Sequence, residues 1–147
     1  MKKIVLFFMM MLLAVTGCSV IEEGKNSLDY ANEAVTYIDH VGTFAGELTT
    51  LAQDAVNDEA ARKELETKLQ DLQKESKAFN ELTPPDFAKD IHQQIVDYNN
   101  QLNELIDSTT KNIEEGKANL ADFQNSELMQ TVQQLQDLKT KVENLGQ

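Results

Sequence analysis

Hydrophobic side chains recur along most of the chain with the spacing of an α-helix. Between residues 28 and 56, apolar and small residues fall into two interleaved heptad series, which together cover an arc of about 140° at 100° per residue. Polar residues fill the opposite side. The two series are Leu28, Ala31, Val35, Ile38, Gly42, Ala45, Thr49, Ala52, Val56 and Tyr30, Ala34, Tyr37, Val41, Phe44, Leu48, Leu51, Ala55. So broad a face predicts a helix that packs against two or more neighbours.

Three further helical patterns follow. Asn57-Asp58 offers an N-cap for a second helix with a narrow apolar stripe, in which Ser76 is the one polar interruption. The third pattern runs from Phe87 to Ile113, and it either ends near Gly116 or continues to Phe123, since an isolated glycine costs a helix only about 1 kcal/mol. The last helix begins after Asn125-Ser126 and stops at Gly146. Its apolar series is Leu128, Val132, Leu135, Leu138, Val142 and Leu145.

The segment Thr83-Pro84-Pro85-Asp86 separates the second pattern from the third. Thr83 has the residue type of an N-cap, Pro84 suits the first helical position, and Asp86 suits the positive end of a helix. Two prolines alone are too short for a polyproline II ligand. The segment therefore predicts a structural corner that starts the third helix.

These patterns predict an all-α fold. Four helices joined by two- or three-residue turns must double back, which gives an antiparallel up-down bundle over residues 27–147. An elongated coiled coil is the alternative, but the first helix has too wide an apolar face for a two-stranded seam. We expect this domain to fold alone as a monomer.

The N-terminus has the layout of a secretory signal. Lys2 and Lys3 precede the apolar run from Ile4 to Val15, which as a helix would span about 18 Å of a roughly 30 Å hydrocarbon core. Residues 1–17 are therefore expected to be cleaved. The junction Val15-Thr16-Gly17-Cys18 resembles the bacterial lipobox, in which the cysteine receives a diacylglyceryl lipid before cleavage. An ordinary secretory signal with an incidental cysteine, or an uncleaved anchor, is the alternative.

The lipobox resemblance implies attachment to the membrane through a lipid on Cys18, on the extracytoplasmic face of the cell membrane. Two acyl chains anchor firmly, whereas one binds only marginally. Cys18 is the only cysteine, so no internal disulfide exists. Residues 18–26 are mixed in composition and contain Gly24, which predicts a lipidated tether of at most roughly 27 Å.

Several segments of the mature chain resemble a family of small helical lipoproteins of unknown function from low-GC Gram-positive bacteria. The segments are Asn26 to Tyr30, Pro84 to Gln94 with its Asp90-Ile91-His92-Gln93-Gln94 stretch, and Asn125 to Leu128. The resemblance implies a lipoprotein with a helical body, and it carries no activity or binding residue.

Charge narrows the range of partners. Loss of Lys2 and Lys3 with the signal leaves 11 basic against 25 acidic side chains, a net charge of −14. Such a body repels nucleic acid and anionic lipid headgroups, so we expect no nucleic-acid partner. Hydrophobic residues make up 41% of the chain and are periodic, which excludes a disordered body.

No catalytic or metal-binding motif is readable. His40 and His92 have no second histidine or carboxylate three or four residues away, so no metal site is expected. His40 lies on a polar arc and is expected to be solvated. His92 flanks the third helix's seam and is expected to be a partly buried structural histidine, with Asp90 or Asp86 as a candidate partner. We expect no cofactor.

The chain's serines also lack a catalytic setting, because Ser19, Ser27, Ser76, Ser108 and Ser126 lie in cap, tether or helix contexts. The aromatic line Tyr30, Tyr37 and Phe44 invites a ligand-groove interpretation, but its heptad spacing favours core packing. We therefore expect a noncatalytic interaction or structural module at the cell envelope, with an unidentified protein partner. The alternatives are a small-ligand or cation-binding lipoprotein and, third, a wall-modifying enzyme.

Overall fold

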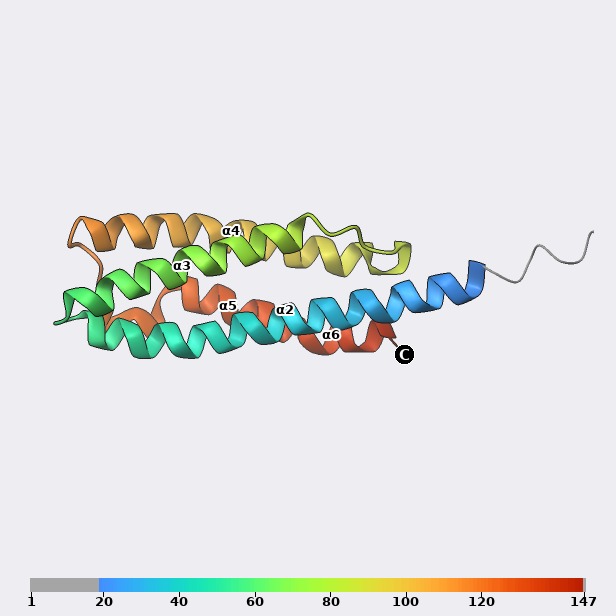
Figure 1. Cartoon of the computed structure of the whole chain (residues 1–147), viewed down its shortest axis with the longest axis horizontal. Coiled ribbons are helices and arrows are strands. Elements are labelled where there is room, and N and C mark those ends of the chain that lie inside the picture. Colours follow the sequence, from blue (N-terminus) through green and yellow to red (C-terminus); the bar gives the residue numbers. More distant parts are fainter. Residues whose placement is uncertain (1–18, 147) are drawn as a thin grey trace, which may run out of the picture.

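The computed structural model describes residues 19–146, and every regular element in this range is helical. Four helical rods lie along one long axis and alternate in direction, with the fourth divided between two short helices (Figure 1). The predicted all-α antiparallel bundle is confirmed. The elements are α2 (Ser19–Ala55), α3 (Glu59–Asn80), the 3₁₀ helix η1 (Asp86–Ala88), α4 (Lys89–Glu114), η2 (Leu120–Asn125), α5 (Glu127–Asp137), α6 (Lys139–Glu143) and η3 (Asn144–Gly146). The predicted signal peptide, residues 1–17, and Cys18 lie outside the described residues.

The longest helix, α2, contacts α3, α5, α6 and η2, as its broad apolar face predicts. Within residues 28–55 of this helix, ten residues are buried: Tyr30, Ala31, Ala34, Tyr37, Ile38, Val41, Ala45, Leu48, Ala52 and Ala55. Gly42 leaves room for the side-chain amide of Gln136 from α5, because a methyl group there would lie 2.1 Å from Nε2 of that amide. Five alanines and a glycine on this face thus allow neighbouring helices to pack close to α2.

Of the predicted tether, residues 18–26, the part from residue 19 to residue 26 is helical and forms the start of α2. The segment contains no proline, and a single glycine costs a helix only about 1 kcal/mol, so the helix propagates through Gly24. Eight helical residues span about 12 Å, less than half of the extended length. The first helix therefore extends alone past the other rods as far as Ser19 (Figure 1).

The start of α3 is as predicted. Asp58 is the N-cap, and its Oδ1 accepts hydrogen bonds from the backbone N–H groups of Ala60, at 2.8 Å, and Ala61, at 3.4 Å. The connection from α2 is three residues long, Val56 to Asp58. The buried residues of α3 form a narrow stripe, which is Leu65, Leu69, Leu72, Ser76 and Phe79.

The corner between α3 and α4 was predicted incorrectly in its details. Thr83 caps no helix and Pro84 is not helical; instead Pro85, at φ −65° and ψ 158°, precedes η1, and α4 begins only at Lys89. The reason is steric, because a residue that precedes proline is pushed out of the α region. Pro84 precedes Pro85, so the helix cannot start at Pro84. Asp86 does lie in the first helical turn, as predicted.

The open question at Gly116 is resolved as a break. Gly116 has φ +68°, its N–H donates to the carbonyl of Ile113, and the N–H of Lys117 donates to the carbonyl of Asn112. This pair of bonds is a Schellman C-cap, which glycine adopts without a Cβ penalty. The connection to α5 then runs from residue 115 to residue 126 and includes η2, so the predicted two- or three-residue turn is wrong here.

The fourth rod begins as predicted and is then interrupted. Ser126 is the N-cap of α5, and its Oγ accepts a hydrogen bond from the N–H of Met129 at 3.3 Å. At Leu138 the backbone N–H donates to the carbonyl of Leu135 at 3.1 Å, a tighter turn that separates α5 from α6. The predicted apolar series still faces the core, since Leu128, Val132, Leu135, Leu138 and Val142 are all buried.

Candidate functional site

A hollow of about 400 Å³ opens on the seam between α2 and α3. We call it the aromatic hollow; its lining is Glu33, Thr36, Tyr37 and His40 from α2, Glu75, Ala78 and Phe79 from α3, and Leu82 just after the end of α3. Tyr37 and Phe79 are buried and stack with ring centroids 4.5 Å apart at 21°. The seam therefore offers an apolar floor within reach of solvent, at the low end of the volumes typical of ligand sites.

The rim of the aromatic hollow is negatively charged. Glu33 and Glu75 stand on opposite helices, and Nδ1 of the exposed His40 lies 3.8 Å from Oε2 of Glu75. No lysine or arginine is among the residues that line it. A cation that entered this hollow would meet carboxylates from both walls.

Directly beneath this hollow, Tyr37 joins two helices that do not lie next to each other. Its hydroxyl donates to Oδ1 of Asn99 on α4 at 2.6 Å. Burial raises the pKa of Tyr37 well above its ordinary value; the hydrogen bond to Asn99 opposes this rise, and the charge of Glu75 adds to it. The phenol is therefore a neutral hydrogen-bond donor over the whole physiological range.

A second contact of the same kind lies one heptad earlier. Tyr30 Oη and His92 Nδ1 are 3.0 Å apart, and both pairs are separated by 62 residues in the chain. Equal separation means that α2 and α4 run parallel, as first and third rods of an up-down bundle do (Figure 1). Burial raises the pKa of Tyr30 to about 12, with a smaller contribution from Glu33.

The polar contacts extend from Asn99 into α3. Its Nδ2 donates to the carbonyl of Ser76 at 3.3 Å and to Oδ1 of Asn80 at 2.8 Å, while Ser76 Oγ donates to Oδ1 of Asn103 at 2.6 Å. Ser76, Asn99 and Asn103 are all buried. Every polar side chain in this buried group is hydrogen-bonded, as a stable core requires.

Asn99 and Asn103 were missed in the sequence. Both occupy positions on the apolar stripe of α4, four residues apart and between Ile95 and Ile106, so they share the face that is turned to the core. Asparagine is uncommon at core positions. Two asparagines four residues apart on an apolar stripe, together with Ser76 on the stripe of α3, could therefore have indicated buried polar contacts between the two helices. The interruption at Ser76 is thus explained by its bond to Asn103.

His92 is a buried structural histidine, as predicted, with only 8% of its surface exposed. Its expected carboxylate partner is wrong, because the ring nitrogen pairs with Tyr30 and the ring stacks on Phe79 at 5.4 Å. Asp86 pairs with Lys89 instead, which lowers the pKa of that carboxyl. Burial lowers the pKa of His92, so the ring is held neutral.

The other two candidates from the sequence are His40 and the aromatic line of Tyr30, Tyr37 and Phe44, and most of these residues lie where they were predicted. His40 is exposed, and Tyr30 and Tyr37 of the aromatic line are core residues. Phe44 is half-buried at the surface, where Nζ of Lys68 lies 5.3 Å from its ring centroid. The aromatic line thus forms core and hollow floor together, rather than an open groove along its whole length.

A second hollow of about 430 Å³ lies on the same α2–α3 seam, nearer the turn between the two helices. We call it the acidic hollow; its lining is Glu47, Thr50, Leu51, Asp54, Glu64 and Lys68. Nζ of Lys68 donates to Oε2 of Glu47 at 2.8 Å, and this hydrogen bond raises the pKa of Lys68. The side chains of Asp54 and Glu64 take part in no ion pair within the described range.

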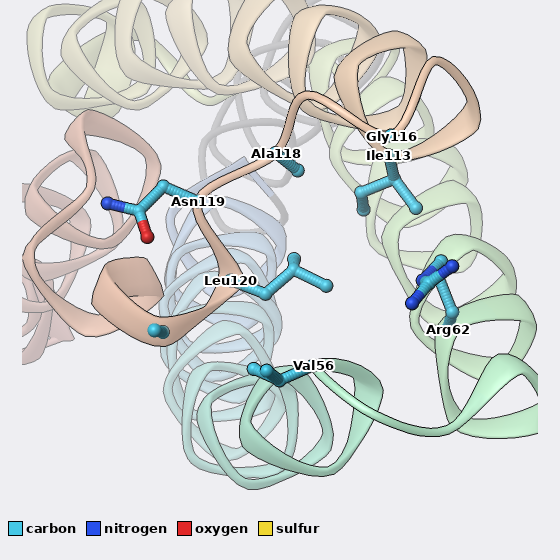
Figure 2. A pocket seen from close by; sticks show the side chains of 8 residues that line it. Val56, Arg62, Ile113, Gly116, Ala118, Asn119 and Leu120 are labelled. Carbon is cyan, nitrogen blue, oxygen red and sulfur yellow. The ribbon is translucent and has the colours of Figure 1, made fainter.

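A third hollow, of about 280 Å³, lies at the end of the bundle where α2 and α4 finish (Figure 2). Arg62 points into it from α3, opposite Ile113 and Leu120. Nη2 of Arg62 donates to the carbonyl of Ala55 at 3.2 Å, close to the negative end of α2. A helix end therefore already uses the charge of this guanidinium, which makes the hollow a weaker candidate than the α2–α3 seam.

Within the described range, no group of three or more histidine, cysteine or acidic side chains is arranged to hold a metal ion. In that same range no helix has both the length and the apolarity needed to span a bilayer. The lipobox residues Val15, Thr16 and Gly17 and the acceptor Cys18 lie outside it.

Comparison with known proteins places the chain in a family. Residues 30–145 match the family described as "Family of unknown function (DUF6376)". The chain belongs to this family. It is also 40% identical over 136 residues, 92% of each chain, to the uncharacterized lipoprotein YybP of Bacillus subtilis (strain 168). The chain is therefore a homologue of a lipoprotein, and the suspected family resemblance is confirmed. No solved structure matches it.

Proposed function

We propose that the chain is a lipoprotein anchored through Cys18 on the extracytoplasmic face of the cell membrane, and that its helical body is a noncatalytic interaction module. The anchor is supported by the Val15-Thr16-Gly17-Cys18 junction and by the lipoprotein homologue, which covers 92% of the chain. Because α2 begins at Ser19, the anchored cysteine is followed at once by the bundle's first helix. The body is then held close to the membrane.

The observation that carries the interaction role is the α2–α3 seam. It joins an apolar floor, made of the buried Tyr37 and Phe79 and the partly exposed Leu82, to carboxylate rims that face solvent. Interfaces combine an apolar centre with a polar rim in the same way. The hydroxyls of Tyr30 and Tyr37 and the imidazole of His92 are engaged in structural hydrogen bonds, which supports a noncatalytic role.

Two measurements test this proposal. Mass spectrometry of the mature N-terminus is expected to find a lipid-modified Cys18, and Cys18→Ser is expected to release or mislocalise the protein. Membrane crosslinking followed by pulldown is expected to recover a protein partner that Ala78→Gln, which fills the aromatic hollow, reduces. An unmodified N-terminus refutes the anchor, whereas capture that is insensitive to Ala78→Gln refutes the role of the seam.

A small-ligand or cation-binding role is the second candidate. The 400 Å³ volume of the aromatic hollow and its two carboxylates, Glu33 and Glu75, favour a small organic cation. A ligand that binds only the native state raises the melting temperature, so thermal-shift screening with amines and divalent cations tests it. No shift at millimolar ligand would exclude it.

A further inference from the structure

The two hollows on the α2–α3 seam are spaced for a single extended occupant. Tyr37 lines the aromatic hollow and Thr50 lines the acidic hollow, thirteen positions further along α2. At a rise of 1.5 Å per residue this is about 20 Å along the helix. A helix of about four turns laid along the seam reaches both hollows with side chains two heptads apart, which lie near the same face.

The charges on the seam select a basic occupant. Five carboxylates line the two hollows, those of Glu33, Glu47, Asp54, Glu64 and Glu75. Against them stands one lysine, Lys68, which is already bonded to Glu47. The seam is therefore more acidic than its own cations neutralise, and it attracts positive charge from outside the molecule.

The same charges exclude other macromolecular occupants. Nucleic acid and anionic lipid would meet carboxylates on both walls of the seam. A second copy of this chain carries the same net charge of −14 in its mature form. A small amine fills one hollow but cannot reach the other, about 20 Å away along α2.

We infer that the α2–α3 seam binds a basic amphipathic helix of about four turns, which places an apolar side chain in each hollow and lysine or arginine against the carboxylate rims. The inference rests on the proposed interaction role and specifies its partner's chemistry. Lys68 lines the acidic hollow, reaches over the ring of Phe44, and competes with the partner's cations for Glu47. Removal of this lysine is therefore expected to tighten binding.

The test uses the full mature lipidated chain in nanodiscs of neutral lipid, with empty nanodiscs as the blank. The probe is a fluorescein-labelled 18-residue helix of leucine and lysine, with leucines fourteen positions apart on one face. The same peptide with glutamate for lysine is the charge control. Anisotropy is expected to show binding of the lysine peptide only, weakening steeply between about 50 mM and 500 mM NaCl because exposed charges are screened.

Matched variants locate the binding surface. The pair Glu33→Gln and Glu75→Gln is expected to weaken binding about 3- to 10-fold, as two exposed ion pairs contribute. The control pair Glu104→Gln and Glu114→Gln removes the same amount of charge from exposed positions of α4. This pair is expected to change the affinity for the peptide by less than about twofold. Lys68→Gln is expected to tighten binding of the lysine peptide, by about the factor that one exposed ion pair contributes.

The inference would be overturned if the glutamate peptide bound as tightly as the lysine peptide. It would also be overturned if the α4 control pair weakened binding as much as the seam pair, or if a short diamine saturated the site and displaced the peptide. A dimer that Glu33→Gln and Glu75→Gln dissociate would identify a second copy as occupant and overturn it too. If membrane crosslinking captures a partner through the seam while the lysine peptide does not bind, the interaction role stands and the basic helix is refuted. If Cys18→Ser leaves the protein anchored, the proposed anchor fails, and the peptide assay still judges the seam.

Discussion

Replacement of Asn99 is the sharpest test of the buried polar contacts. Asn99 is fully buried; its Oδ1 accepts a hydrogen bond from the Tyr37 hydroxyl at 2.6 Å, and its Nδ2 donates one to Oδ1 of Asn80 at 2.8 Å. In Asn99→Leu, the buried phenol of Tyr37 loses its acceptor, and an unsatisfied buried group costs about 1–3 kcal/mol. Loss of the bond to Asn80 adds about 0.5–1.5 kcal/mol. We expect a total destabilisation of about 1.5–4.5 kcal/mol.

A second substitution separates the hydrogen bond from packing. Tyr37→Phe alone leaves Oδ1 of Asn99 without its donor, whereas Tyr37→Phe combined with Asn99→Leu removes both partners and leaves neither group stranded. The double variant is therefore expected to be less destabilised than the sum of the single variants, by about 1–2 kcal/mol. Urea unfolding followed by circular dichroism measures all four proteins. Additive losses within about 0.5 kcal/mol would refute the contribution of this contact.

Three further predictions concern pH, glycine and caps. Because burial lowers the pKa of His92 in the folded state, the unfolded chain takes up a proton on this ring at a higher pH than the folded chain does. The contribution of His92 to stability should therefore be constant above about pH 6.5 and fall below it. Urea midpoints of the native chain and of His92→Gln between pH 5 and 7.5 check this. Gly116 has φ +68°, so Gly116→Ala should destabilise the protein by about 1–2 kcal/mol. Gly46 is helical and a methyl group there meets open space, so Gly46→Ala should stabilise the protein by up to about 1 kcal/mol. The two variants should therefore shift the thermal melting temperature in opposite directions. Ser126→Ala should cost about 0.5–2 kcal/mol, but Thr83→Ala less than about 0.5 kcal/mol, and equal losses in urea would contradict the cap assignments.

The bundle was predictable because each helix carries its own periodic signal. The wide apolar face of α2 required several neighbours, and the caps at Asp58 and Ser126 follow from local hydrogen-bonding chemistry. At the α3–α4 corner the same local rules were applied to the wrong proline, since Pro84 cannot be helical before Pro85. At Gly116 the sequence permitted two outcomes, and tertiary packing of η2 against α2 selects the break.

The candidate site was harder to predict because it depends on which helices meet. Nothing local to Tyr37 indicates that Asn99, 62 residues away, receives its hydroxyl. The partner of His92 was sought among nearby carboxylates, but the ring meets Tyr30 from another helix. The hollows on the α2–α3 seam likewise combine side chains from two helices, and their shape follows from the rotation of each helix about its axis.

The paired contacts between α2 and α4 restrict how the molecule can move. Sliding α4 along α2 by one helical turn would shift Asn99 and His92 by about 5.4 Å and strand the hydroxyls of Tyr37 and Tyr30 together. A piston-like stroke between these rods is therefore opposed at two levels at once. Movements that keep both contacts intact, such as a common bend or a rotation of α2 and α4 together, meet no such opposition.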